Sequence, residues 1–145
     1  MISLTEDQTK AIRAHGERDY PFECCGLLVG RFSEAGLKTV VETYPISNAR
    51  EEEAKRTRFL IRPEELMRGE RHARSRGLDV VGFYHSHPDV QAVPSAYDLE
   101  HAWPTYSYVV VSVRTGSAAE LRSWEMKQDR SRFDEEEIRV ASREQ

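Results

Sequence analysis

The sequence predicts one α/β (α+β) domain in which helices flank a central β-sheet. A chain of 145 residues is the size of one ordinary domain and is too short for two domains with separate cores. Short apolar runs typical of buried strands alternate along it with polar stretches of helical periodicity. The sequence contains no proline-, glycine- or serine-rich linker that would divide it. These observations predict strands and helices packed around one core.

The composition argues against several classes of function. The 21 lysines and arginines are outnumbered by 25 aspartates and glutamates, so the formal net charge is −4, whereas a protein that binds nucleic acid needs a basic face. The sequence has no apolar run of the length that crosses a membrane, and its first residues do not resemble a secretory signal. Two adjacent cysteines do not form a disulfide framework. We therefore expect a cytoplasmic protein with no nucleic-acid or membrane partner, and the sequence leaves its oligomeric state open.

The first half of the chain predicts one helix, two strands and a loop. Residues 5–8 have capping-box spacing, so a helix should begin there and end near residues 19–21. Residues 24–30 are apolar on both faces and predict a fully buried strand. Residues 37–46 are rich in Val, Thr and Tyr and predict a second strand. Residues 48–58 have no apolar stripe and predict an exposed loop.

The second half of the chain predicts a helix followed mainly by strands. Pro63 stands where proline is tolerated, in the first turn of a helix that runs to about Arg76 and stops at Gly77. Residues 129–145 alternate in charge and predict either a terminal helix or a frayed tail. The expected strands of this half cover residues 59–61, 79–84, 106–113 and 120–126.

Two histidines and an aspartate follow the predicted strand over residues 79–84. His85 and His87 are two residues apart, so in an extended chain their side chains project to the same face. Pro88 cannot continue the ladder, so the strand should open into a loop there. Asp98 lies ten residues further on and can fold back toward the imidazoles. Two imidazoles and one carboxylate form a zinc site whose fourth position stays open for catalysis.

Each part of this pattern also has a structural interpretation. A His-x-His pair arises by chance in chains with five histidines, and it could be two exposed loop residues. Ser95 and Asp98 have the spacing of an N-cap, which predicts a short helix that Pro104 terminates. A helix start is also a rigid way to present Asp98, so the two interpretations are compatible. The spacing alone does not decide whether these residues bind a metal.

The string HSHPDVQAVPSAYD, at residues 85–98, is similar to the signature of the JAMM (MPN+) metallopeptidases. Glu23 stands just before a buried strand, where that family places its catalytic glutamate. The resemblance extends from about Glu6 to Met126 and is nearest to the short prokaryotic branch that processes ubiquitin-like sulfur carriers. It implies a single MPN/JAMM domain over residues 1–128, with a mixed sheet like that of cytidine deaminases, and a charged tail or helix over residues 129–145.

The resemblance also implies a role for each residue of the signature. His85, His87 and Asp98 match the ligands of one Zn²⁺ per chain. Glu23 matches the general base that deprotonates the attacking water, and Ser95 matches the hydroxyl that hydrogen-bonds the tetrahedral intermediate. The implied reaction is hydrolysis of an amide or isopeptide bond after the C-terminal Gly-Gly of a ubiquitin-like or sulfur-carrier protein, which would be the substrate partner.

Other hypotheses for the function stay open at this point. An MPN-type scaffold could keep these residues and act only by binding proteins. A zinc hydrolase of small amides is a second alternative, although the Cys-x-x-Cys pattern of the deaminases is absent from the sequence. A non-haem iron oxygenase also uses two histidines and one carboxylate.

Some neighbouring residues have two possible roles. Cys24 and Cys25 are expected to be buried thiols that act as small hydrophobes, although a thiolate ligand would close the metal site. Ser86 should face away from the histidines and either serve packing or support the site from behind its ligands, and it is not expected to be a nucleophile. His101 could support the site from behind its ligands. The loop over residues 48–58 is a candidate flap over an extended peptide.

Overall fold

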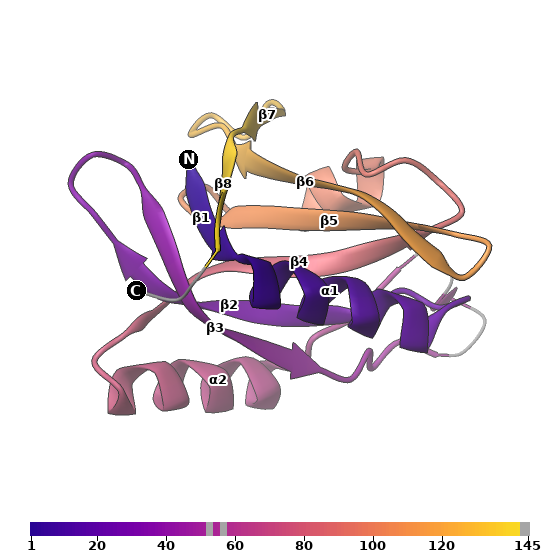
Figure 1. Cartoon of the computed structure of the whole chain (residues 1–145), viewed down its shortest axis with the longest axis horizontal. Coiled ribbons are helices and arrows are strands. Elements are labelled where there is room, and N and C mark those ends of the chain that lie inside the picture. The colour runs from indigo at the N-terminus through magenta and orange to yellow at the C-terminus, as the bar shows by residue number, and fades with distance from the viewer. Residues whose placement is uncertain (52–53, 56–57, 143–145) are drawn as a thin grey trace.

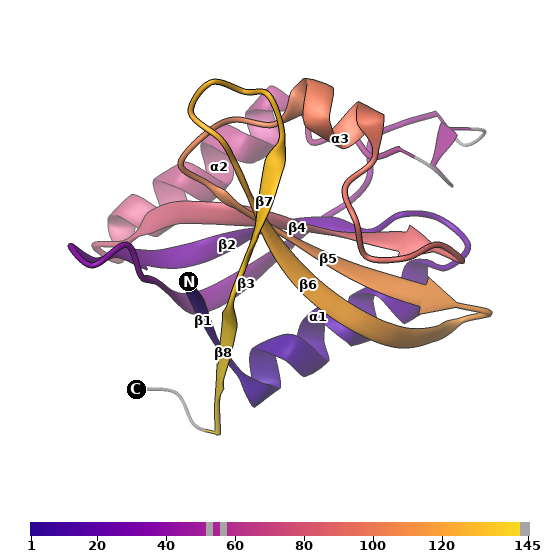
Figure 2. The same ribbon diagram turned by 90° about the horizontal axis from the view of Figure 1, so that it is seen from above.

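A computed structural model of the chain describes residues 1–51, 54–55 and 58–142. These residues form a mixed eight-stranded sheet with the strand order β7-β6-β5-β4-β2-β3-β1-β8, together with three α-helices. Figures 1 and 2 show the arrangement. The elements are β1 (Ile2–Thr5), α1 (Glu6–Asp19), β2 (Cys25–Phe32), β3 (Lys38–Ile46), α2 (Pro63–Ser75), β4 (Asp79–Pro88), α3 (Ala96–His101), β5 (Ser107–Arg114), β6 (Ser117–Met126), β7 (Phe133–Glu136) and β8 (Ile138–Ala141).

Helices cover both faces of the sheet. Figure 2 shows α1 on one face and α2 with α3 on the other. Each face has its own apolar cluster: Leu28 of β2 packs with Ile12 of α1, while the adjacent Leu27 packs with Ala73 of α2. Neighbouring residues of β2 therefore enter opposite layers of the core, which confirms the prediction of a strand buried on both faces.

The first helix begins with the predicted capping box. The Thr5 hydroxyl accepts a hydrogen bond from the Gln8 amide nitrogen at 3.1 Å, and the Gln8 side chain accepts one from the Thr5 amide nitrogen at 2.9 Å. These bonds satisfy two donors at the helix start. Pro63 likewise lies in the first turn of α2, as expected. Both helices therefore begin where the sequence places them.

The strand that carries the histidines is longer than predicted. β4 continues four residues beyond the expected end at Tyr84, because the parallel neighbour β5 pairs with it up to Pro88 and Val113. On its other side β4 runs antiparallel to β2, where Cys25 pairs with His85. His85 and His87 thus lie within a strand bordered on one side by the start of β2 and on the other by β5, which fixes their backbone.

One other expectation for local structure is wrong, and one strand was not expected. Residues 59–61 are not a strand, because the Leu60 amide nitrogen donates to the side chain of Asn48 instead of to a neighbouring strand. β1 was not predicted from sequence; it is only four residues long and lies between β3 and β8 in the sheet. A strand this short is too brief for an alternating pattern to identify.

The described part of the expected tail, residues 129–142, contains the strands β7 and β8 and not the expected helix or frayed tail. β7 pairs with β6 and β8 pairs with β1, so one extended segment joins strands from opposite ends of the sheet order (Figure 2). Its charged side chains pair across strands: Glu135 accepts from Arg122 at 2.7 and 2.9 Å, and Glu136 accepts from Ser123 at 2.8 Å. The alternating charge of this segment therefore reflects cross-strand pairing and not a solvated helix.

A close contact between β2 and β4 predicts that Gly26→Ala destabilises the fold by about 1–3 kcal/mol. A Cβ at Gly26 would lie 2.2 Å from the ring of Tyr84, whose hydroxyl is hydrogen-bonded to His15 at 2.7 Å. The buried ring is held in place by this bond, so the added methyl must displace β2 or break the bond. Chemical denaturation of the parent and the variant measures the loss, and equal stability would show that the ring can move aside.

Candidate metal centre

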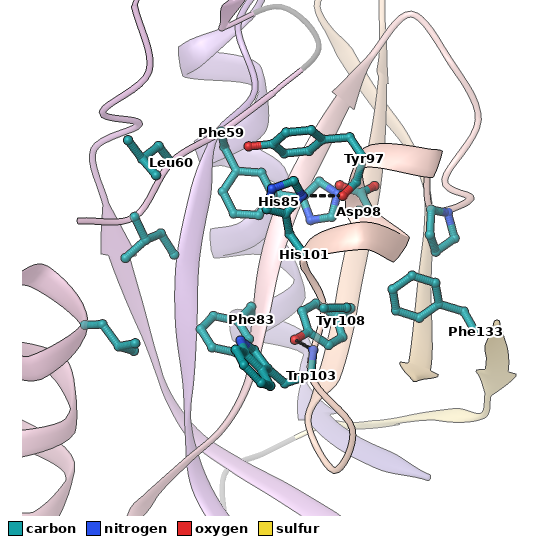
Figure 3. A pocket seen from close by; sticks show the side chains of 14 residues that line it. Phe59, Leu60, Phe83, His85, Tyr97, Asp98, His101, Trp103, Tyr108 and Phe133 are labelled. Atoms are coloured by element: carbon teal, nitrogen blue, oxygen red, sulfur yellow. Dashed lines mark hydrogen bonds and ion pairs between the residues drawn. The ribbon is translucent and has the colours of Figure 1, made fainter. Parts of the chain in front are cut away.

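The structure brings together the three residues that the sequence nominates as metal ligands. His85 and His87 lie on β4, and Asp98 lies in the first turn of α3. The Nε2 atoms of the two histidines are 3.2 Å apart, and each is 3.2 Å from Oδ2 of Asp98. Figure 3 shows His85 and Asp98 at the edge of a pocket. Among the described residues, these three form the one group of ligand atoms close enough to hold a metal ion together.

The spacing of these atoms fits a tetrahedral metal ion. Bonds of about 2.0–2.1 Å from zinc to nitrogen or oxygen imply ligand atoms about 3.3 Å apart at the corners of a tetrahedron. The three observed separations of 3.2 Å match three edges of that tetrahedron. The donor set of two imidazoles and one carboxylate occupies three corners and leaves the fourth for water or substrate. The residues therefore fit the metal that the family resemblance implies.

The two histidines are oriented in different ways. His87 donates from Nδ1 to the carbonyl oxygen of Gln91 at 3.0 Å, which directs the lone pair of Nε2 toward the site. In the described residues, Nδ1 of His85 is buried without a hydrogen-bond partner. Instead, the ring of Phe59 stacks on the His85 ring with centroids 4.7 Å apart and an interplanar angle of 28° (Figure 3). One candidate ligand is thus held by a hydrogen bond and the other by an aromatic ring.

Asp98 is both a helix-capping residue and a candidate ligand. The Ser95 hydroxyl accepts from the Asp98 amide nitrogen at 3.1 Å, and Oδ2 of Asp98 accepts from the Ser95 amide nitrogen at 2.9 Å. The same Oδ2 faces the histidines, so the capping interpretation and the metal interpretation hold together. Burial opposes the charge of Asp98. The imidazole of His85, together with the hydrogen bonds to the carboxylate from His85, His87 and the Ser95 amide nitrogen, outweighs it and holds the pKa of Asp98 well below its usual range.

Glu23 is buried beside this group. Glu23 is only 4% exposed and lies two residues before the start of β2. Burial, reinforced by the negative charge of Asp98, raises the pKa of Glu23 to about 9. A divalent cation held nearby would lower that pKa again, because it stabilises the carboxylate. Glu23 therefore has the environment of a proton acceptor whose charge depends on the metal.

Ser95 lies at the start of α3 and is exposed. The hydrogen bond from the Asp98 amide nitrogen uses a lone pair of its hydroxyl oxygen and not the hydroxyl proton. The hydroxyl can therefore still donate a hydrogen bond to an incoming group. The helix cap places this donor in the same turn as the candidate ligand.

The cysteines near the site act as structural residues. Both are fully buried, and burial raises the pKa of Cys24 to about 12 and that of Cys25 further still. Neither belongs to the group of potential metal ligands in the described part of the chain. Ser86 lies between the histidines and is fully buried, and its hydroxyl accepts from the Cys24 amide nitrogen at 2.7 Å.

The pocket beside the metal group is mainly apolar and has a volume of about 210 Å³. His85 and Asp98 form part of its wall, together with Phe59, Phe83 and Tyr108 (Figure 3). His101 also lines the pocket, but its Nδ1 is bonded to the Tyr97 carbonyl at 2.8 Å and it lies outside the ligand group of the described residues. The sequence did not single out the three aromatic residues, because aromatic side chains in such positions usually fill the core.

Part of the expected flap over residues 48–58 can be described. Residues 52–53 and 56–57 of that prediction lie outside the described residues. Arg50 donates to the Tyr97 hydroxyl at 3.2 Å, and the Arg58 guanidinium lies 5.0 Å from the centre of the Tyr97 ring. The described part of the loop therefore contacts α3 next to Asp98. Its role as a flap stays a prediction.

No helix in the described ranges is long and apolar enough to span a membrane.

Residues 5–127 match the family of prokaryotic homologs of the JAB domain. The chain is 39% identical to the desampylase of Haloferax volcanii over 116 residues, which cover 77% of this chain and 80% of that protein. It is 32% identical to the CysO-cysteine peptidase of Mycobacterium tuberculosis over 125 residues, 86% and 82% of the two chains. A solution structure of a Desulfitobacterium hafniense protein superimposes with a TM-score of 0.85 at 32% identity, covering 99% of this chain and 94% of the other. As the signature implied, the chain belongs to the prokaryotic JAB (JAMM/MPN) family.

Proposed function

We propose that this protein is a zinc metallopeptidase that hydrolyses the amide or isopeptide bond after the C-terminal Gly-Gly of a ubiquitin-like or sulfur-carrier protein. In this proposal His85, His87 and Asp98 hold one Zn²⁺ per chain. The observation that carries it is the approach of two imidazole nitrogens and one carboxylate oxygen to 3.2 Å from one another. The names of the desampylase and the CysO-cysteine peptidase support this substrate class.

The residues of the site divide the chemistry between them. Bound zinc would polarise the scissile carbonyl and make water acidic enough to attack at neutral pH. The Glu23 carboxylate accepts the proton of the attacking water and returns it to the nitrogen of the leaving amine. The Ser95 hydroxyl donates to the oxygen that becomes negatively charged during attack. Glycines at the end of the carrier suit the site because they have no Cβ to obstruct a close approach of the backbone.

Cleavage of defined carrier adducts tests the proposal. The zinc-loaded protein is incubated with a ubiquitin-like carrier extended after Gly-Gly by a peptide, by cysteine or by an isopeptide-linked lysine, and the products are identified by mass spectrometry. The proposal expects the carrier to be released with a free C-terminal glycine. A protein-binding scaffold would give no cleavage with any divalent metal, and an iron oxygenase would consume oxygen.

Removal of the metal should abolish this activity reversibly. Treatment with a chelator is expected to lower the rate by at least about a thousandfold, because both the nucleophile and the carbonyl depend on the ion. Addition of one equivalent of Zn²⁺ should restore it. The measurement is the initial rate of adduct cleavage alongside the zinc content of each sample. A rate that survives complete metal removal would contradict the proposal.

A further inference from the structure

Asn48 is the one asparagine of the sequence, and its side chain uses its full hydrogen-bonding capacity next to the metal centre. Its Nδ2 donates to the carbonyl oxygens of Glu23 and Arg58, both at 3.0 Å. Its Oδ1 accepts from the amide nitrogens of Arg50 and Leu60, both at 3.0 Å. A single amide group thus ties the backbone of the proposed base to three residues of the segment that precedes α2.

Two of these bonds bracket Phe59. The Arg58 carbonyl and the Leu60 amide nitrogen belong to its neighbours in the chain, so Asn48 fixes the backbone on both sides of Phe59. The Phe59 ring is in turn the one stacked on His85, at 4.7 Å between centroids. A continuous series of contacts therefore runs from the backbone of Glu23 through Asn48 and Phe59 to a candidate ligand.

The stacked Phe59 ring is important for His85 because, within the described part of the chain, His85 lacks the hydrogen bond that orients His87. In a metal-binding histidine, the ring nitrogen that does not face the metal is commonly fixed by a hydrogen bond. In His87 the carbonyl oxygen of Gln91 accepts this bond. For His85 the structure shows no such bond to Nδ1 from the described residues, and that atom is buried. The stacked Phe59 ring restricts rotation of the His85 ring and so takes the place of the hydrogen bond.

We propose that Asn48 and Phe59 are positioning residues that hold the proposed base Glu23 and the ligand His85 in one frame. Phe59 orients the His85 imidazole by stacking, and Asn48 fixes both Phe59 and the Glu23 backbone. This inference rests on the proposed function in assigning a base and a metal ligand. The stacking contact and the four hydrogen bonds are independent of the substrate.

The Phe59 part of the proposal is tested by metal affinity in the absence of substrate. Phe59→Leu removes the ring but keeps apolar volume, and it should weaken Zn²⁺ binding about tenfold, the lower end of the effect of losing a supporting partner of a ligand. Phe59→Tyr keeps the ring and should bind zinc as the parent does. The matched control is Phe83→Leu, because Phe83 lines the same pocket and stacks on Tyr108 but not on a ligand. Competition with a chromophoric chelator gives each affinity, and a Phe59→Leu affinity within twofold of the parent overturns the proposal.

The Asn48 part is tested by a double-mutant cycle. Asn48→Ala should weaken zinc binding in the parent, but should add little to the loss in the Phe59→Leu background, because Asn48 acts on His85 through Phe59. Its effect on kcat should persist in both backgrounds, because it reaches Glu23 by a separate bond. Losses of zinc affinity that simply add would overturn the coupling.

A second variant and the choice of readout keep the two proposals separate. If Asn48→Ala does not fold, Asn48→Asp takes its place in the same cycle, because it keeps the acceptor for Leu60 and loses the donor to Arg58. Zinc affinity is measured on the protein alone. A parent protein that binds zinc but cleaves no adduct would therefore refute the proposed function and leave the positioning role to be decided by the affinities.

Discussion

Replacement of Glu23 by Gln is expected to lower the rate of adduct cleavage by about a thousandfold, within the range typical of a lost general base. The amide keeps the size of the side chain but cannot accept the proton of the attacking water. The proposed metal ligands on β4 and α3 are unchanged, so the variant should still bind one equivalent of zinc. Mass spectrometry of the cleavage products and metal analysis of the same sample measure both effects.

A matched control separates this effect from a general change of charge. Glu64→Gln removes a carboxylate from the first turn of α2, at an exposed position, and is expected to keep the parental rate. If Glu23→Gln cleaves as fast as this control, Glu23 is not the base. If it loses zinc together with activity, the carboxylate has a role in metal binding that the proposed mechanism does not give it.

Glu23→Gln is also expected to change how the stability of the chelator-treated protein depends on pH. The pKa of Glu23 is raised to about 9 in the folded chain, above its ordinary value of 4.5. The folded state therefore retains a proton that the unfolded state releases, and the stability contributed at low pH is lost as the pH rises from about 5 toward 9. Glu23→Gln has no such loss, so its stability advantage over the parent should grow across this window in chelator-treated samples. Denaturation at several pH values measures it, and a constant difference would show that burial of Glu23 is not costly.

The sequence was sufficient for elements defined by local pattern. The capping box at Thr5 and the proline at the start of α2 are local signals, and both helices begin there. β7 and β8 were missed because strand pairing stabilises them: β7 pairs with the preceding strand β6, and β8 pairs with β1 at the other end of the chain. Glu135 pairs with Arg122 on β6, and Ile138 lies opposite Ile2 of β1. A segment of alternating charge does not identify such partners.

The candidate site also has a part that the sequence indicates and a part that only the fold reveals. Strand alternation and a helix cap can bring His85, His87 and Asp98 together, but this spacing alone does not decide for a metal site. The resemblance of residues 85–98 to the JAMM signature is what singles the three residues out in the sequence. The supporting contacts cannot be recognised there, because they join residues that only the fold brings together. The Asn48 side chain reaches a carbonyl 25 residues earlier in the chain, and Phe59 stacks on a histidine of a different element. Nothing in the local pattern around either residue indicates its partner.

The second large effect is expected from Asp98→Asn, which should abolish zinc binding and, with it, turnover. The amide oxygen can still accept the hydrogen bond from the Ser95 amide nitrogen, so the start of α3 should be preserved. The substitution removes the one carboxylate of the ligand group, and a neutral amide attracts a divalent cation much more weakly. The loss of affinity should exceed the roughly 10–100-fold effect of removing a residue that only supports a ligand.

Ser95→Ala is the comparison that separates the two functions of this capping box. It removes the acceptor for the Asp98 amide nitrogen and should cost about 1 kcal/mol of stability. It also removes the proposed donor to the reacting oxygen, so kcat should fall by about 10²–10³, but all three proposed ligands remain and zinc should still bind. Isothermal titration with Zn²⁺ and denaturation of both variants test this contrast. If Asp98→Asn binds zinc as tightly as Ser95→Ala does, Asp98 is not a ligand, and the convergence of its Oδ2 with the two imidazoles is only a hydrogen-bonded contact between β4 and α3.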